Sequence, residues 1–399
     1  MLKKISFIVL ANLLLFIFLE FSLKTTLKLL NKKTVYEIGN ISSNNYDYLT
    51  GYYNVPNTEE TLTPTYRQAT DKYGFSIDGE RKEKDLTIKK DHIFRIFILG
   101  GSTVIGHNLK NKYDPISARL EKKLNAKLSK KNLKYEVINA GTTSFFSGQE
   151  FSLIEKKIVY AMKPDYIIVL NGTNDYALPF ESEIHLSNSH FYQREFQKQF
   201  NKSSQNFFYF SDDWLSKNVS LYFIMKKSIE KITGKYLFEA EFREKKYRNK
   251  DKISQEIITE RKMYRYIYNI KRVSEIATKE TYVSYFFQPQ MLPKNIKDHS
   301  KNDRDKYNNM KDCDKEYFPK KQLFYDLAVN EIKNLNKTDK MKSNKYFQLI
   351  DISETLNLPN NSKNFYSDHV HYNELSREII AESIFKNIET NIRSMKKLN

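Results

Sequence analysis

Residues 94–106 read FRIFILGGSTVIG, and this stretch decides the fold. Its first part, Phe94–Leu99, is almost continuously apolar and rich in bulky or β-branched side chains, which is typical of a strand buried on both faces of a parallel sheet. Two glycines follow at once, and Ser102 comes directly after them. Ligands of open α/β sheets bind outside the carboxyl ends of the strands, so a functional site is expected in the segment that begins at Gly100.

Four further runs have the same strand character: Tyr135–Ala140 (YEVINA), Tyr166–Leu170 (YIIVL), Thr281–Phe287 (TYVSYFF) and Tyr346–Ile352 (YFQLIDI). Segments of helical periodicity, Ile116–Leu128 and Glu150–Met162, separate the first three runs. This alternation of strand and helix predicts a doubly wound α/β domain around a five-stranded parallel sheet.

The predicted domain spans residues 91–390. Because the gap between the third and fourth runs is far longer than a crossover needs, residues 181–280 are interpreted as an inserted helical subdomain, with a helix over Ser254–Ala277. This insertion is either a lid over a pocket or a partner-binding or purely structural element, and the sequence favours neither. Residues 291–320 are charged and predict a surface loop. Residues 31–90 are polar and are interpreted as a linker that leads irregularly into the domain.

The most apolar stretch of the chain is Ile5–Leu23, and its length fits a bilayer crossing. No small-residue cleavage pattern comes after it, so residues 1–30 are predicted as an N-terminal transmembrane helix that acts as an uncleaved single-pass membrane anchor. A buried or peripheral amphipathic helix is the alternative. Basic residues flank both sides and do not decide the orientation. An extracytoplasmic catalytic domain is expected because such anchors usually export the domain attached to them.

The composition argues against two classes of partner. The 399 residues carry a formal net charge of +18, but the lysines are scattered, and no zinc-finger, aromatic RNA-binding or basic-helix signature accompanies them. No nucleic-acid partner is therefore predicted. The single cysteine, Cys313, cannot form an internal disulfide and has no metal-ligand spacing. With no clustered histidines or carboxylates at such a spacing either, neither a metal nor a cofactor is expected.

Residues with useful chemistry follow several of the predicted strands. Ser102 follows the first, Gly141 the second and Asn174 the third, while Asp368 and His371 lie beyond the fifth. A serine hydroxyl is a weak nucleophile that needs a base. His371 would take its proton, and Asp368, three residues earlier, would bind the other imidazole nitrogen and set its tautomer. The N–H groups of Ser102 and Gly141 and the side chain of Asn174 could then stabilise an oxyanion.

This combination resembles the SGNH hydrolases, also called GDSL-type. The family's four blocks correspond, in order, to Gly100-Gly101-Ser102, Gly141, Gly172-x-Asn174-Asp175 and Asp368-x-x-His371. The resemblance covers roughly residues 94–175 and 281–385. It implies a flavodoxin-like three-layer α/β/α fold, ester hydrolysis or acyl transfer, and supporting places for Gly101, Gly172 and Asp175. The N-terminal anchor is similar to that of bacterial members tied to cell-surface polysaccharide modification.

The turn after the first strand has plainer interpretations as well. Ser102 could be only the N-cap of a helix. Gly101 and Gly106 have the spacing of a phosphate-binding loop, but His107 and Asn108 stand where that loop needs Lys and Ser or Thr. His107 is therefore expected at the surface or on the rim of a pocket.

The other candidates also have alternatives. His371 could be a structural histidine, and His369 competes for the role of base, although Tyr366 stands where its carboxylate partner would be needed. Asp175 is expected to anchor its loop rather than react. Gln288 ends the fourth strand at the same edge of the sheet and is a weak candidate for contact with substrate.

Three functions stay open. The first is a serine-dependent ester hydrolase acting on O-acyl groups of a cell-envelope saccharide or lipid. The second is an O-acyltransferase that uses the same residues to modify a cell-surface polysaccharide, with envelope polysaccharide machinery as its partner. These two share an acyl-enzyme and differ in the acceptor that resolves it. The third is a catalytically silent glycan-binding or assembly protein on the same fold, because fold does not fix function.

Overall fold

The computed structural model describes residues 2–29, 44–47, 50–63, 66–81, 85–129, 133–177, 215, 219–233, 255–289, 300–309, 312–357, 363–368 and 371–395. The chain divides into two units, which are considered separately. The helical unit comprises Met1–Asn45, Glu181–Glu183 and Tyr192–Asp251. The sheet unit comprises Tyr46–Phe180, Ile184–Phe191 and Lys252–Asn399.

Five parallel strands form the centre of the sheet unit, in the order β6-β5-β7-β8-β9. They are β5 (Ile93–Gly100), β6 (Lys134–Asn139), β7 (Tyr166–Asn171), β8 (Tyr282–Phe287) and β9 (Phe347–Asp351). Every residue of β5, β7 and β8 is buried, as their apolar runs predict. The five-stranded parallel sheet is thus confirmed, and its strand order is the flavodoxin-like one.

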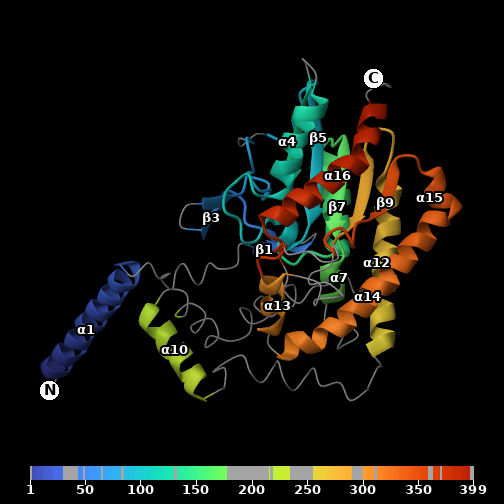
Figure 1. Cartoon of the computed structure of the whole chain (residues 1–399). Coiled ribbons are helices and arrows are strands. Elements are labelled where there is room, and N and C mark those ends of the chain that lie inside the picture. The colour runs from blue at the N-terminus through green and yellow to red at the C-terminus, as the bar shows by residue number, and fades with distance from the viewer. Residues whose placement is uncertain are drawn as a thin grey trace. The chain divides into compact units, whose positions relative to one another are not determined.

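Helices cover both faces of this sheet (Figure 1). On one face, α4 (Ile116–Leu128) and α16 (Glu374–Met395) share a core with side chains of β5, β6, β7 and β8. The opposite face carries α5 (Ser147–Leu153), the π-helical turn η1 (Ile154–Ile158), α6 (Val159–Met162), α12 (Gln255–Ile276), α14 (Asp312–Lys337) and α15 (Asp339–Ser343). Aromatic contacts tie this second layer to β8, with ring centroids 4.8 Å apart between Phe287 and Tyr325.

The segment 181–280 is described only at residues 215, 219–233 and 255–280, and its interpretation as an inserted helical subdomain stays a prediction. The helix predicted over Ser254–Ala277 is present as α12, which packs on β8 in the sheet unit, whereas α10 (Ser220–Thr233) falls in the helical unit. One prediction about a segment outside the sheet was wrong. The segment 291–320 is not only a loop, since it contains α13 (Lys301–Asn308) and the start of α14. Ser300 begins α13 as its N-cap, and its hydroxyl accepts the Asp303 N–H at 3.2 Å.

The predicted linker over residues 31–90 is described at residues 44–47, 50–63, 66–81 and 85–90, and part of it is hydrogen-bonded to the end of β6 and the loop that follows. The short strands of this part of the chain are β1 (Asn44–Asp47), β2 (Gly51–Asn54), β3 (Glu59–Thr63) and β4 (Tyr66–Ala69). The buried amide of Asn54 donates to the Gly141 carbonyl at 2.9 Å. The Ser76 N–H donates to the Asn139 carbonyl at 3.0 Å. These bonds fasten the segment to the loop that follows β6.

In the helical unit, the predicted N-terminal helix forms as α1 (Leu2–Leu29). The carboxylate of Glu20 accepts the N–H groups of Ser220 and Leu221 at 2.8 and 2.9 Å, and so caps the first turn of α10. Within the described residues, no helix combines the length and the apolarity needed to cross a membrane. The membrane anchor over residues 1–30 stays a prediction.

The buried pair of Arg95 and Glu136 joins β5 to β6, with Nε and Oε2 3.1 Å apart. Arg95 also donates to the carbonyls of Leu86 and Met162, at 2.5 and 3.0 Å. Replacing Arg95 by Met removes the cation from a buried carboxylate, so we expect the free energy of unfolding to fall by about 3–5 kcal/mol. Urea unfolding would measure it, with Arg95→Met/Glu136→Leu recovering part of the loss. A single variant as stable as wild type would contradict this account.

Candidate active site

Asp368 and His371, which the sequence predicts as an acid–base pair, contact each other within one turn of chain. The Nδ1 atom of His371 lies 2.8 Å from Oδ2 of Asp368, and the backbone N–H of His371 donates to Oδ1 at 2.7 Å. The three-residue spacing lets one carboxylate bind both the main chain and the ring of the same residue. With Nδ1 engaged by the carboxylate, Nε2 is the nitrogen positioned to take up a proton.

Helix α13 holds this turn in place, which the sequence did not predict. Asp303 is fully buried, and its Oδ2 accepts the Phe365 N–H at 3.0 Å. Lys306 donates to the Tyr366 carbonyl and, at 3.0 Å, to the side chain of Asn364. The sequence contains one signal that could have predicted α13. Ser300 is followed three positions later by the acidic residue Asp303, a pattern typical of helix N-termini.

Ser102 is the first residue of the one-turn helix α3 (Ser102–Ile105), which follows strand β5 with only Gly101 between them. The N–H groups of Gly106 and His107 both donate to the Ser102 carbonyl, at 3.1 and 3.0 Å. Ser102 and His371 are both described, and no hydrogen bond joins their side chains. Catalytic hydrogen bonds are often long without substrate and tighten in the reacting complex. The evidence that the two residues share a site comes from His107.

His107 is a half-buried neighbour of His371 rather than a residue of the surface. Its ring stacks on that of His371, with the centroids 4.7 Å apart and the planes 11° from parallel. Its Nε2 lies 3.1 Å from Oγ1 of Thr143, in the loop after β6. Burial, together with the nearby charge of His371, lowers the pKa of His107 to about 4, so its ring is neutral at pH 7. The turn after Ser102 therefore contacts His371 directly.

Asn174 lies on the other side of the Ser102 turn, in α7 (Thr173–Ala177). Its Nδ2 donates one hydrogen to the Phe145 carbonyl at 2.7 Å, and an amide nitrogen has a second hydrogen to give. A Cβ atom on Gly101 would lie only 2.2 Å from this Nδ2. A residue larger than glycine at position 101 would therefore push the Asn174 amide away. Gly172 lies just before α7, against the ring of Phe287.

The predicted role of Gly141 as an oxyanion donor needs correction. Its N–H already donates to Oδ1 of Asn139 at 3.0 Å. A Cβ there would lie 2.5 Å from the Ile105 nitrogen, so this glycine serves close packing between two loops. Ser144, three residues on, has a φ of 59° and donates its N–H to no described residue. It lies between Thr143, which bonds His107, and Phe145, which bonds Asn174.

The remaining candidates are buried and hold elements together. Asp175 accepts both the N–H and the hydroxyl of Ser147, at the start of α5, consistent with the anchoring role expected for it. Gln288 is 3% exposed, and its amide donates to the Thr173 hydroxyl. This burial gives no support to the predicted contact of Gln288 with substrate. His369 lies outside the described residues.

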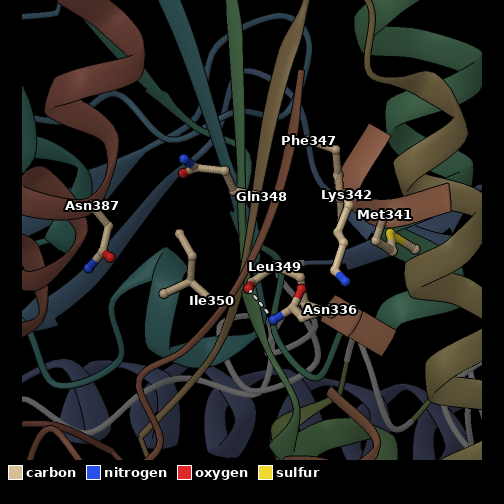
Figure 2. Close-up of a pocket in the computed structure, with 8 residues that line it drawn as sticks. All are labelled: Asn336, Met341, Lys342, Phe347, Gln348, Leu349, Ile350 and Asn387. Atoms are coloured by element: carbon tan, nitrogen blue, oxygen red, sulfur yellow. Dashed lines mark hydrogen bonds between the residues drawn. The ribbon is translucent and has the colours of Figure 1, made fainter. Parts of the chain in front are cut away.

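A pocket of about 330 Å³ lies along the edge strand β9, and it contains none of the predicted site residues. Figure 2 shows Gln348, Leu349 and Ile350 of β9 beside Asn387 and Asn336, whose amide donates to the Leu349 carbonyl at 3.0 Å. No set of three or more His, Cys, Asp or Glu side chains among the described residues is arranged to bind a metal ion.

The buried Asp175 predicts a pH dependence of stability. Burial raises its pKa from an ordinary value of 3.8 to about 6. Because the pKa of Asp175 is higher in the folded protein than in the unfolded chain, its protonated form stabilises the fold. This contribution to the free energy of unfolding is present below pH ~4 and is lost as the pH rises through ~6. Relative to Asp175→Asn, wild type should therefore lose about 2 kcal/mol of unfolding free energy between pH 4 and 7. Urea unfolding across this range measures the difference, and parallel curves for the two proteins would contradict it.

No family model matches the chain, and no curated protein matches it. A solved lipase/acylhydrolase from Enterococcus faecalis is 12% identical, with 74% of this chain and 96% of that chain covered and a TM-score of 0.37. A lipolytic G-D-S-L family protein from Veillonella parvula is 11% identical, with coverages of 74% and 97% and a TM-score of 0.34. A psychrotrophic esterase from Pseudoalteromonas sp. is 10% identical, with coverages of 75% and 99% and a TM-score of 0.34. At these TM-scores the likeness carries no argument about the reaction. The chain is similar to solved lipolytic hydrolases, the class that its four motifs resemble.

Proposed function

We propose that this protein performs acyl transfer from an ester, with Ser102 as nucleophile, His371 as general base and Asp368 as the group that orients the base. The observation that carries the proposal is the 2.8 Å contact between Asp368 Oδ2 and His371 Nδ1. The His371 ring also stacks on a residue of the turn that begins at Ser102. A base fixed by a carboxylate next to a serine turn is the arrangement that activates a hydroxyl nucleophile.

The chemistry follows from these positions. Ser102 Oγ attacks the ester carbonyl carbon while His371 Nε2 takes the hydroxyl proton. The tetrahedral intermediate collapses when the C–O bond to the alcohol breaks, and the imidazolium returns the proton to that leaving alcohol. The acyl group stays on Ser102 until water, activated by the same imidazole, attacks it and releases the acid. Each step is a proton transfer or an exchange of one oxygen for another at the acyl carbon.

The oxyanion formed in each half-reaction needs fixed donors. We assign these to the Ser102 N–H, the second hydrogen of the Asn174 amide and the Ser144 N–H, which replaces that of Gly141. The support for Ser144 is its place between two residues that contact His107 and Asn174. One such donor typically contributes about 3 kcal/mol to transition-state stabilisation.

The proposed substrate is an O-acyl group on a cell-envelope saccharide or lipid. The support for this location is the apolar stretch Ile5–Leu23, which would tether the protein at a membrane with its catalytic domain outside the cytoplasm. Water is the proposed acceptor. A sugar hydroxyl in place of water would make the same residues those of an O-acyltransferase working with envelope polysaccharide machinery.

Ser102 should be the residue that reacts with a fluorophosphonate probe. We expect wild type to be labelled and Ser102→Ala to be spared, because only an activated serine attacks the phosphorus at a useful rate. The matched control is Ser152→Ala, which removes a hydroxyl from α5 that donates to the Gly148 carbonyl. In-gel fluorescence reads the result. Equal labelling of wild type and Ser102→Ala would refute the proposed nucleophile.

The acceptor can be identified in cells. Mass spectrometry of envelope glycans and lipids should show more O-acyl groups in a strain that carries Ser102→Ala than in wild type, because the esterase that removes them is lost. Fewer acyl groups in the variant would instead identify a transferase. Identical acylation in both strains would contradict an envelope ester as the substrate.

A further inference from the structure

The residue after His107 contacts the other member of the acid–base pair. Asn108 donates from Nδ2 to Oδ2 of Asp368 at 2.8 Å and approaches Oγ of Ser367 at 3.2 Å. Its φ is 60°, a left-handed conformation that asparagine adopts more readily than most residues. This backbone conformation belongs to the same turn that presents the neighbouring His107 ring to His371.

The turn that carries these two residues is fastened by α16. Arg377 is 2% exposed, and its Nη2 donates to the His107 carbonyl at 2.6 Å and approaches the Asn108 carbonyl at 3.4 Å. Asp114 is also buried and accepts the Lys110 N–H at 2.6 Å, which closes the far end of the turn. A turn held at both ends through its main chain can hold its side chains in fixed positions.

Asp368 needs such support because its side chain is 36% exposed. Water competes for a carboxylate at this exposure, and the 2.8 Å bond from Asn108 occupies the same oxygen that faces His371 Nδ1. Among the described residues, Asp368 is the one that fixes an edge of the His371 ring. The parallel ring of His107, itself fixed by Thr143, limits rotation of the imidazole out of its plane.

We propose that the turn formed by His107 and Asn108 positions the acid–base pair: Asn108 holds Asp368, and His107 holds the ring plane of His371 while linking it to the loop that carries Ser144. The inference rests on the proposed function, because it concerns the same site. Both are positioning residues that act through the base.

The direct test is Asn108→Gly, which removes the side chain and keeps a residue that tolerates the left-handed conformation. The matched control is Asn57→Gly, because Asn57 is exposed, has a φ of 51° and contacts none of the site residues. We expect the maximal rate of fluorophosphonate labelling to fall about 10- to 100-fold in Asn108→Gly, with little change in the half-saturating probe concentration. Asn57→Gly should match wild type.

A second readout does not depend on activity. The hydrogen between Asp368 and His371 Nδ1 should give a low-field proton NMR resonance, assigned by its loss in His371→Ala. It should broaden or vanish in Asn108→Gly and persist in Asn57→Gly, because only the first variant frees the carboxylate. Asn108→Asp keeps the size and backbone preference of the residue but places a second carboxylate beside Asp368, so it should have the same effects.

The link through His107 is tested by a double-mutant cycle. His107→Phe keeps a flat ring but loses Nε2, and Thr143→Val removes the same hydrogen bond from its other end. Each single variant should be labelled more slowly than wild type. The labelling rate of the double variant should lie within twofold of that of the slower single variant, because the two changes break one interaction. Fully additive effects would overturn the link between the base and the loop after β6.

The outcomes distinguish a wrong positioning role of Asn108 from a wrong proposed function. If wild type is labelled and Asn108→Gly is labelled at the same rate with its low-field resonance intact, the positioning role is wrong and the proposed nucleophile stands. If wild type is not labelled, the proposed function fails, and the NMR resonance alone still decides whether Asn108 holds Asp368.

Discussion

The parallel pairing of β5 with both β6 and β7 is the constraint on which the rest of the structure depends. In this register Ile98 lies opposite Asn139, and Gly100 lies opposite Leu170. The chain therefore leaves β5 towards one side to form β6 and returns on the other side of β5 to form β7. The loops after these three strands meet at the point where the strand order reverses, which is where open α/β sheets bind ligands. The Ser102 turn, the Ser144 loop and α7 owe their proximity to this reversal.

His371, the proposed base, reaches the same edge from the far end of the chain, and other contacts hold it there. Its turn is bonded by α13 from one side and contacted by the His107 turn from the other. The lead-in segment contributes through Asn54, which binds the carbonyl of Gly141. Saturated main-chain hydrogen bonds of this kind hold loops rigid, and an oxyanion site requires rigid donors, because they need no reorganisation during the reaction.

Much of the sheet and the contact between Asp368 and His371 can be predicted from the sequence. The five strands were predicted to within two residues at each end, and α4 at its observed bounds, because periodicity directly reflects burial. The contact between Asp368 and His371 follows from their spacing within one turn.

Other features depend on main-chain geometry or tertiary contact, which residue types do not encode. Gly141 looked like an oxyanion donor because glycine marks a tight turn, but whether its N–H is available depends on the position of the Asn139 side chain. The stacking of His107 on His371 joins segments 264 residues apart in sequence. Helix α13 was missed because its exposed, charged face carries almost no apolar period.

The central claim is that Ser102 becomes acylated with His371 as its base. Its most direct test is rapid mixing of the protein with p-nitrophenyl acetate, an acid quench within milliseconds, and peptide mapping by mass spectrometry. The account predicts one acetyl group per chain, on the peptide that contains Ser102, and almost none in His371→Ala. Release of p-nitrophenol with an unmodified Ser102 peptide, or acetylation of a different residue, would contradict it.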